Sequence, residues 1–383
     1  MDSGFRRNDG ILMTRPTFTD TDERHMRRAL ALAERGLFTT QPNPRVGCVV
    51  AHGDTVVGEG WHVRAGEPHA EPIALRKAGE RARGATVYVT LEPCAHHGRT
   101  PPCADALIEA GVARVVAATK DPNPKAVGGL ERLRAAGIDT ASGLLEGEAR
   151  ALNAGFFSRM ERGCPWVRLK IAASLDGRTA LANGESKWIT GSAARDDVQR
   201  WRARSSAILT GIGTELADDP LLTVRLDTEH VAPLRVILDS NLRTPAGSHV
   251  LAGDAPTLIV HARDAKPSDD RFARVELLGI DGQDGRLDLA AVLAELARRE
   301  VNELQVEAGP ILSGAFLAAG LADELLLYFA PKLLGDTAQP MALLPALPAL
   351  ADAPTMTLVE HSTCGPDLRL RLLKGSPDVH RHR

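Results

Sequence analysis

Three residues with metal-binding side chains occur at spacings that suit a zinc site. His69 begins the run His69-Ala-Glu71, and Pro93-Cys94 and then Cys103 follow a predicted strand. One imidazole and two thiolates suit Zn²⁺, and three protein ligands leave a fourth position for water. Glu71, two residues after His69, can face that water without binding the metal. We therefore predict His69, Cys94 and Cys103 as zinc ligands and Glu71 as the group that accepts and returns protons.

The combination of His-x-Glu with Pro-Cys is typical of zinc enzymes that remove an amino group from nucleobases. Such enzymes activate a water for attack on a carbon that carries an exocyclic amine, and ammonia leaves. Here eight residues separate the two cysteines instead of the usual two. The resulting loop must fold over the site, and Arg99 and the histidines in it could select a substrate with a phosphate.

Two other interpretations of these residues stay open. The zinc site could be closed and structural, with His62, His96 or His97 as fourth ligand, although this leaves the His-Ala-Glu placement unexplained. Alternatively, Cys94 and Cys103 could be buried thiols that bind no metal.

Glycine-containing turns in the second half of the chain are weaker signals. No complete G-x-G-x-x-G follows a strand there, and Gly211-Ile-Gly213 lacks the third glycine. The run Glu307-Ala-Gly-Pro-Ile-Leu-Ser-Gly314 is a predicted strand end that leads into a helix. Its glycines would let the backbone approach a ligand, and the helix N-terminus favours phosphate. A tight strand–helix turn explains the same residues equally well.

The elements that must position these residues alternate between strand and helix. In the first half we expect strands at 46–51, 55–61, 85–91 and 114–119, with helices at 20–36, 69–80, 104–110 and 127–136. After a helical stretch at 143–163 we expect strands at 167–172, 207–209, 234–238, 258–260, 274–278, 303–307 and 324–329, with helices at 192–204 and 287–299. This order indicates an α/β fold with two domains, the first built on a largely parallel sheet. The expected bounds are 14–145, a linker over 146–164, and 165–376.

Length and composition agree with a two-domain globular protein. The chain has 383 residues, of which 44% are hydrophobic and 25% charged, and its formal net charge is −3. This charge and an aromatic content of 4% argue against a nucleic-acid partner. No apolar run is long enough to span a membrane. Five unevenly spread cysteines make a disulfide framework improbable, so we predict a cytoplasmic protein.

Longer motifs in this sequence resemble the bifunctional deaminase/reductase family of riboflavin biosynthesis. The resemblance covers nearly the whole chain beyond residues 1–12. Only small departures, such as Ile73 and Ala95, interrupt it. It implies a cytidine-deaminase-like α/β domain followed by a dihydrofolate-reductase-like α/β domain. The motifs are Asn43-Pro-Arg-Val-Gly47, the run from Thr90 to Cys103, Asp121-Pro-Asn-Pro124, Ala173–Arg178, Gly184–Thr190, Ala217–Pro220 and Ala330–Gly335.

The resemblance implies two consecutive reactions on a small phosphorylated pyrimidine. The first domain would deaminate 2,5-diamino-6-(5-phosphoribosylamino)pyrimidin-4-one, with Asn43 near the pyrimidine. The second would use NADPH to reduce the ribosyl group of 5-amino-6-(5-phosphoribosylamino)uracil to ribityl. Relatives also suggest a homo-oligomer.

The same motifs carry the family's reductase contacts onto this chain. The implied NADPH contacts are Ala172, Trp188, Thr214, Asp218, Ser240, Gly309, Pro310, Ile311, Leu312, Ser313, Gly314 and Ala315. The implied substrate contacts are Ser186, Arg202, Leu222, Arg225 and Glu307. Arg202 and Arg225 are suited to a bidentate grip on the 5′-phosphate, and Glu307 and Lys170 could orient or protonate the opening sugar.

Simpler explanations exist for each of these residues and for the chain. Arg202 on a helix could be solvated, Trp188 could be a core or rim aromatic, and Asp218-Asp219-Pro220 could be only a turn. The whole chain could be a nucleotide or tRNA deaminase with a regulatory or binding second half, or a zinc-stabilised nucleic-acid-binding module.

Overall fold

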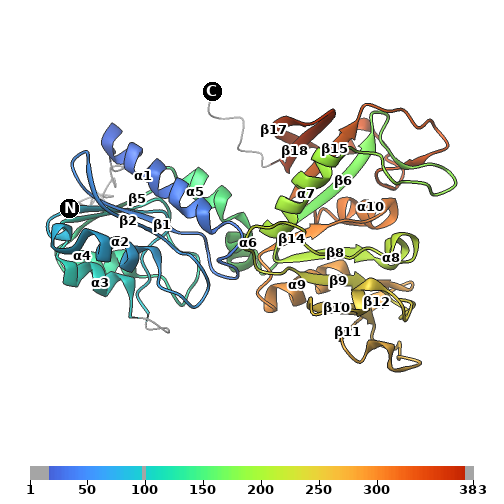
Figure 1. Cartoon of the computed structure of the whole chain (residues 1–383), viewed down its shortest axis with the longest axis horizontal. Helices are drawn as coiled ribbons and strands as arrows, with labels where there is room; N and C mark the ends of the chain where they lie inside the picture. Colours follow the sequence, from blue (N-terminus) through green and yellow to red (C-terminus); the bar gives the residue numbers. More distant parts are fainter. Residues whose placement is uncertain (1–16, 97–100, 376–383) are drawn as a thin grey trace, which may run out of the picture. The chain divides into compact units, whose positions relative to one another are not determined.

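The computed structural model describes residues 17–96 and 101–375, which form two compact units (Figure 1). Of the described residues, the first unit contains those up to 35 together with Val46–His62 and those within 66–151. The second contains Gly36–Arg45, Val63–Ala65 and the described residues from 152 to 375. Each unit is a sheet with helices packed against it, so the expected two-domain α/β class is confirmed.

The sheet of the first unit has the order β2-β1-β3-β4-β5. Its strands are β1 (Gly47–His52), β2 (Thr55–Trp61), β3 (Thr86–Val89), β4 (Arg114–Ala117) and β5 (Asp139–Ser142). Strands β3, β4 and β5 are parallel, but β1 pairs antiparallel with both β2 and β3. The expectation of a largely parallel sheet is therefore wrong for the half of the sheet that β2, β1 and β3 form. The connection Gly53-Asp54 between β1 and β2 is so short that it joins only antiparallel strands.

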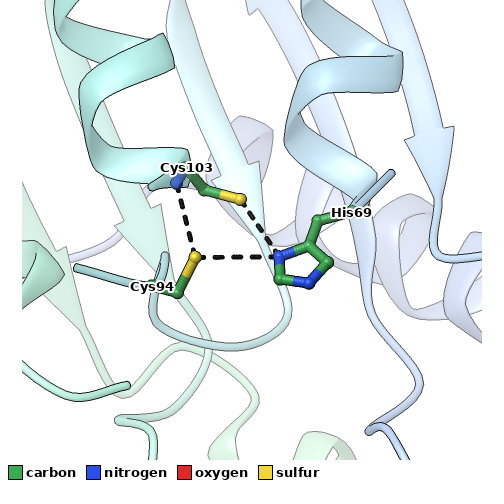
Figure 2. Close-up of side chains that lie close together, drawn as sticks. All are labelled: His69, Cys94 and Cys103. Carbon is green, nitrogen blue, oxygen red and sulfur yellow. Dashed lines mark hydrogen bonds between the residues drawn. The ribbon is translucent and has the colours of Figure 1, made fainter. Parts of the chain in front are cut away.

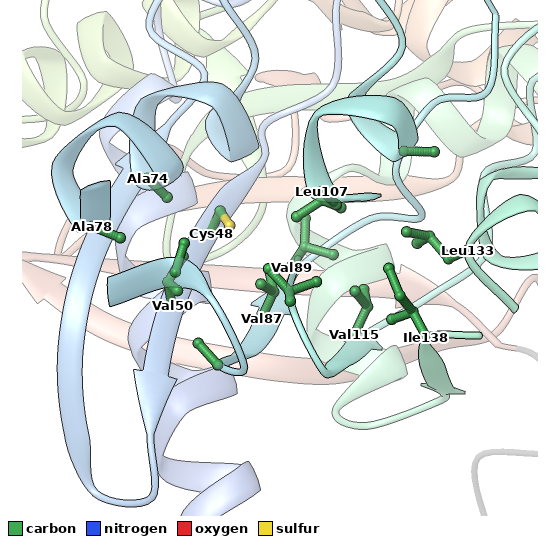
Figure 3. Packing of buried hydrophobic residues seen from close by; sticks show 14 of the residues in the cluster. Cys48, Val50, Ala74, Ala78, Val87, Val89, Leu107, Val115, Leu133 and Ile138 are labelled. Carbon is green, nitrogen blue, oxygen red and sulfur yellow. The ribbon is translucent and has the colours of Figure 1, made fainter. Parts of the chain in front are cut away.

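Helices cover both faces of this sheet. One face packs against α2 (Ala70–Ala78), α3 (Cys103–Ala110) and α4 (Gly129–Ala135), and the other against α1 (Asp20–Ala33) and α5 (Glu146–Leu152). Figure 3 shows Ala74, Ala78, Leu107 and Leu133 of these helices beside strand residues such as Val87. Glycines in β2 let α2 lie close, since a Cβ at Gly60 would stand 2.4 Å from the Ala70 carbonyl oxygen.

The sheet of the second unit has the order β11-β10-β9-β8-β14-β6-β15-β18-β17. The strands from β11 to β15 in that order are parallel, whereas β18 and β17 form an antiparallel edge. The bounds are β6 (Trp166–Ser174), β8 (Ala207–Gly211), β9 (Leu234–Leu238), β10 (Thr257–Ala262), β11 (Glu276–Ile280), β14 (Glu303–Val306), β15 (Glu324–Ala330), β17 (Met356–Cys364) and β18 (Asp367–Lys374).

The helices of this unit are α6 (Ala154–Arg162), α7 (Ser192–Arg204), α8 (Ile212–Asp218), α9 (Leu289–Arg298) and α10 (Pro310–Ala318). Two-stranded ladders join β7 (Arg178–Ala180) to β16 (Gln339–Pro340) and β12 (Gly282–Gln283) to β13 (Arg286–Leu287). Short 3₁₀ turns complete the two units: Glu34–Gly36, Gly79–Ala82, His249–Leu251, Asp270–Phe272 and Leu350–Asp352.

The two central strands β6 and β14 are apolar on one face only. Val167 and Leu169 of β6 and Leu304 and Val306 of β14 join the core beneath α9 and α10. The alternate positions carry Arg168, Lys170, Glu303 and Gln305, and successive side chains of a strand point to opposite faces. The opposite face of the central sheet is therefore a buried polar layer, and this layer leads to the second site.

Within the described residues, no helix has the length and apolar character needed to cross a membrane.

Candidate active sites

His69, Cys94 and Cys103 bring their metal-binding atoms together in the first unit (Figure 2). These atoms all lie within 4.8 Å of one another. His69 Nδ1 is 3.2 Å from Cys103 Sγ and 3.7 Å from Cys94 Sγ. His69 immediately precedes α2, Cys103 is the first residue of α3, and Cys94 lies in the loop after β3. Two helix N-termini thus meet at the site, where their dipoles favour negative charge such as thiolate.

The protonation of the two cysteines shows why this cluster fits a dication. Hydrogen bonds from Cys103 and His69 lower the pKa of Cys94 to about 4. The hydrogen bond to Cys94, together with burial, raises the pKa of Cys103 far above its usual range. A dication such as Zn²⁺ would stabilise both sulfurs as thiolates.

Glu71 lies in the first turn of α2 and is 3% exposed. Its carboxylate interacts electrostatically with His69 and Cys94, and its buried Oε2 atom has no hydrogen-bond partner among the residues that the structure describes. Burial raises its pKa. An unsatisfied carboxylate oxygen beside a metal-binding cluster is a group prepared to accept a proton.

The candidates for a fourth ligand do not join this cluster in the described part of the chain. The group of donors that could hold a metal consists of His69, Cys94 and Cys103. His62 packs its ring edge-on against His69, with centroids 5.4 Å apart, and its Nδ1 lies 3.1 Å from the Pro68 carbonyl oxygen. His96 is described but is not a member. His97 and Arg99, which we considered as ligand and substrate contact, lie outside the described residues.

Glu307 is the centre of a second polar cluster, at the carboxyl end of β14. Arg202 of α7 donates from Nε to Glu307 Oε1 at 2.7 Å and from Nη2 to Oε2 at 2.9 Å. Gln305 Nε2 donates to Oε1 at 2.8 Å, and Lys170 Nζ stands 3.9 Å from Oε2. Although burial opposes ionisation, Arg202 and Lys170 hold the pKa of Glu307 well below its ordinary value. Burial lowers the pKa of Lys170.

The geometry of Arg202 differs from the one we expected. We expected a bidentate grip on phosphate, but the bidentate edge of Arg202 binds Glu307 and its Nη1 donates to the Thr223 carbonyl oxygen at 2.9 Å. Arg225 remains closer to the expectation. Its backbone N–H donates to Gln199, while its guanidinium makes no ion pair or hydrogen bond to any residue that the structure describes. Arg225 interacts electrostatically with Arg202 and Glu307, so it lies near the cluster around Glu307.

Leu222 and Ser186 lie in loops of the second unit. Leu222 packs its side chain, 2% exposed, into the core with Ile208 and Ile237. Only its backbone can therefore contact a substrate. Ser186 lies half-buried between β7 and α7. Asn43 lies in the segment Gly36–Arg45, which belongs to the second unit.

Most of the residues implied as NADPH contacts lie at one edge of the second sheet. Ala172 is near the carboxyl end of β6, Thr214 is in the first turn of α8 after β8, and Ser240 follows β9. The register pairs Gly211 with Leu238, so the turn after β8 and the loop after β9 are neighbours. In open α/β sheets, ligands bind at the carboxyl ends of the strands. Asp218 ends α8, and Lys187 Nζ is 3.4 Å from its Oδ1.

Trp188 lies in the loop before α7 and is 64% exposed, which excludes a core role. The Arg195 guanidinium stands 4.6 Å from the centre of its ring, and Lys332 donates to its carbonyl oxygen.

The turn after β14 leads into α10, as the sequence predicts. Gly309 N–H donates to Thr214 Oγ1 at 3.2 Å, which joins this turn to α8. Gly314 has a packing role of its own, because a Cβ there would stand 2.0 Å from the Leu343 carbonyl oxygen. The close approach that this glycine permits is thus to the chain's own backbone. The remaining turn residues, Pro310, Ile311, Leu312, Ser313 and Ala315, form the first turns of α10.

Two positions that support these sites were missed in the sequence. Gln305 helps to hold Glu307, and only the alternation in Glu-Leu-Gln-Val-Glu hints at it. Glu92 holds the loop that follows β4, and nothing in its local sequence indicates this.

The fold and the two clusters define a class of protein that joins a zinc deaminase to a nucleotide-dependent reductase, and comparisons with known proteins agree. The family model for the cytidine and deoxycytidylate deaminase zinc-binding region matches residues 19–119, and the RibD C-terminal domain model matches residues 165–370. Riboflavin biosynthesis protein RibD of Escherichia coli is 53% identical over 92% of this chain and 99% of its own length. The RibD protein of Bacillus amyloliquefaciens is 43% identical over 94% of this chain and 100% of its own length.

Solved structures give the same result. Acinetobacter baumannii RibD has a TM-score of 0.86 at 45% identity and covers 93% of this chain and 99% of its own. A diaminohydroxyphosphoribosylaminopyrimidine deaminase/5-amino-6-(5-phosphoribosylamino)uracil reductase from Thermotoga maritima has a TM-score of 0.83 at 34% identity, with the same coverage. The chain belongs to the RibD family. It is a bifunctional enzyme of riboflavin biosynthesis, with zinc in its deaminase domain and NADPH in its reductase domain.

Proposed function

We propose that this enzyme deaminates 2,5-diamino-6-(5-phosphoribosylamino)pyrimidin-4-one and then reduces the ribosyl group of the resulting aminouracil to ribityl. The observation that carries the proposal is the convergence of His69, Cys94 and Cys103 beside the buried carboxylate of Glu71. The Thermotoga maritima protein, which is similar over both domains, carries the names of both reactions.

In the deaminase domain, His69, Cys94 and Cys103 would hold zinc, which supplies Lewis-acid activation of water. Glu71 accepts a proton from the attacking water and gives it to the ring nitrogen beside the attacked carbon. It then takes the second proton of the added oxygen and passes it to the amine. The carbon–nitrogen bond breaks, ammonia leaves and a carbonyl remains. The family resemblance implies Asn43 as a further contact of the pyrimidine.

In the reductase domain, NADPH supplies the hydride that C1′ receives. Lys170 gives a proton to the sugar ring oxygen as its bond to C1′ opens, and Glu307 orients Lys170 and the sugar. Arg202 acts through Glu307, and Arg225 binds the 5′-phosphate. Ser186 and the backbone of Leu222 complete the substrate contacts.

The cofactor contacts stay as the resemblance implies. They are Ala172, Trp188, Thr214, Asp218, Ser240 and the turn from Gly309 to Ala315.

The remaining sequence-based expectations are part of this proposal. The domain bounds are 14–145 and 165–376 with a linker over 146–164, and the enzyme works in the cytoplasm as a homo-oligomer without nucleic acid.

Product analysis tests the proposal. Zinc-loaded enzyme with the diaminopyrimidine substrate but no NADPH should release one ammonia per substrate and accumulate the aminouracil, and added NADPH should then convert it to the ribityl product. Release of ammonia from cytidine or tRNA adenosine, but not from this substrate, would favour the other deaminase interpretation.

A further inference from the structure

The carboxylate of Glu92 lies buried in the first unit, two residues before Cys94, and is 4% exposed. We propose that Glu92 is a positioning residue for the zinc ligand Cys94. It would hold the loop after β4 and the start of α4 against the segment that carries this cysteine. The inference rests on the proposed role of Cys94 as a ligand.

Three backbone N–H groups donate to the Glu92 carboxylate. Gly128 and Leu130, at the start of α4, donate to Oε1 at 3.2 and 3.1 Å. Asp121, in the loop after β4, donates to Oε2 at 3.2 Å. The backbone N–H of Glu92 itself donates to the Thr119 carbonyl oxygen at 2.9 Å. The backbone and side chain of Glu92 thus join both ends of the segment 119–130 to the loop that carries Cys94.

The residues on either side of Cys94 contact the same segment. Pro93 lies directly against α4, since a Cβ at Gly129 would stand 1.7 Å from the Pro93 carbonyl oxygen. Ala95 N–H donates to the Ala126 carbonyl oxygen at 3.1 Å. Ala126 also packs with the side chains of Cys94 and Cys103. The position of Cys94 therefore depends on a segment that Glu92 holds in place.

Cys94 in turn positions the next ligand. Its Sγ accepts a hydrogen bond from the Cys103 backbone N–H at 3.4 Å, and its carbonyl oxygen accepts one from Ala104 N–H at 3.2 Å. A shift of the Cys94 segment would therefore also move the start of α3, where the second sulfur ligand lies. Groups that orient metal ligands without touching the metal commonly change metal affinity ten- to a hundredfold when they are replaced.

Glu92→Gln is the sharpest test because it keeps the size of the side chain. Its amide nitrogen cannot accept a hydrogen bond, so an N–H group would face either Asp121 N–H or the N–H groups of α4. Glu131→Gln is the matched control, since Glu131 is an exposed acid in the first turn of the same helix. The zinc dissociation constant is measured by chelator competition. The absorption spectrum of the Co²⁺-substituted protein reports the geometry of the thiolate ligands.

We expect Glu92→Gln to weaken zinc binding about ten- to a hundredfold and to change the cobalt spectrum, with Glu131→Gln equal to wild type. Thermal unfolding of the metal-free proteins separates positioning from folding. Wild-type zinc affinity and an unchanged cobalt spectrum in Glu92→Gln would overturn the proposal. A loss of zinc that merely follows a loss of folded protein would overturn it as well.

Cys94→Ser distinguishes a failure of this proposal from a failure of the assignment of Cys94 as a zinc ligand, on which it rests. If Cys94→Ser binds zinc as wild type does, the ligand assignment is wrong. If Cys94→Ser loses zinc and Glu92→Gln does not, only the role of Glu92 is wrong.

Discussion

Glu307 stays ionised while buried because of the specific groups that surround it. Arg202 binds both of its oxygens, and Gln305 and Lys170 complete its surroundings. Replacing one partner of a buried ion pair is costly because the other charge remains without compensation. Arg202 therefore holds Glu307 in its ionised state.

Arg202→Leu is expected to destabilise the reductase domain by about 3 kcal/mol, because it leaves the Glu307 carboxylate buried without its bidentate partner. Urea unfolding measures this loss. The double variant Arg202→Leu/Glu307→Leu, which removes both charges, should be more stable than the single variant. A double variant as unstable as the sum of both single losses would contradict the account.

These two sites differ in how much the sequence could reveal. His69, Glu71 and the cysteines form a recognisable pattern because zinc chemistry fixes their types and their local spacing. The partner of Arg202 could not be predicted, because Glu307 is 105 residues away and only the fold brings them together. For Leu222, the resemblance transfers a substrate contact without saying whether backbone or side chain makes it, and the fold buries the side chain.

Helix α1 is held to the first sheet through one carboxylate near its N-terminus. Asp22 accepts hydrogen bonds from Thr19 N–H, from Tyr88 of β3 at 2.8 Å and from Arg114 of β4 at 2.7 Å. Burial by itself raises its pKa, but these hydrogen bonds outweigh burial and lower the pKa to about 2 from an ordinary 3.8. This element therefore depends on pH.

A folded-state pKa below the unfolded value means that the stabilisation is fully present above pH 4 and disappears as pH falls toward 2. The contribution is on the order of 2 kcal/mol. Asp22→Asn should thus be less stable than wild type by about this amount at pH 7, and the gap should narrow toward pH 2. Denaturant unfolding at both pH values measures it, and a gap of constant size would contradict the assignment.

Gly314 and Gly213, two glycines of the turns considered as cofactor sites, should respond differently to replacement by alanine. Gly314→Ala places a Cβ against the Leu343 carbonyl oxygen and should destabilise the reductase domain by about 1–3 kcal/mol. A Cβ at Gly213 would meet no atom of the described residues within 4 Å, and Gly213 has no positive φ, so Gly213→Ala should keep the stability of the domain. A raised KM for NADPH in Gly213→Ala would show that the cofactor needs this close backbone approach. Equal thermal stability of both variants would contradict the packing argument.

Buried strands could be predicted from the sequence more easily than half-exposed strands and short helices. The strands β8, β9 and β10 are buried on both faces and mostly apolar, so they could be recognised as short continuous runs. The edge hairpin β17–β18 was not predicted, because its residues are mostly half-exposed and their polarity follows no clear period. Helix α8 has only 7 residues and gives little periodic signal.

At the scale of the whole molecule, each domain has its own core and its own cofactor. Removing zinc with a chelator should therefore abolish deamination and lower the unfolding temperature of the deaminase domain alone. Reduction of supplied aminouracil should continue at its wild-type rate. Calorimetry and NADPH oxidation follow the two effects, and loss of both activities on chelation would contradict the assignment of zinc to one domain.

The central claim is that two sites on this chain act in a fixed order, deamination before reduction. NADPH oxidation, followed by absorbance, tests it most directly, with zinc-loaded wild type and Glu71→Gln given either pyrimidine. Wild type should oxidise NADPH with both the diaminopyrimidine and the aminouracil. Glu71→Gln should retain zinc and oxidise NADPH at the wild-type rate with the aminouracil. With the diaminopyrimidine, its rate of NADPH oxidation should fall at least about a thousandfold. If Glu71→Gln oxidised NADPH with the diaminopyrimidine at the wild-type rate, both the order of the reactions and the role of Glu71 would be contradicted.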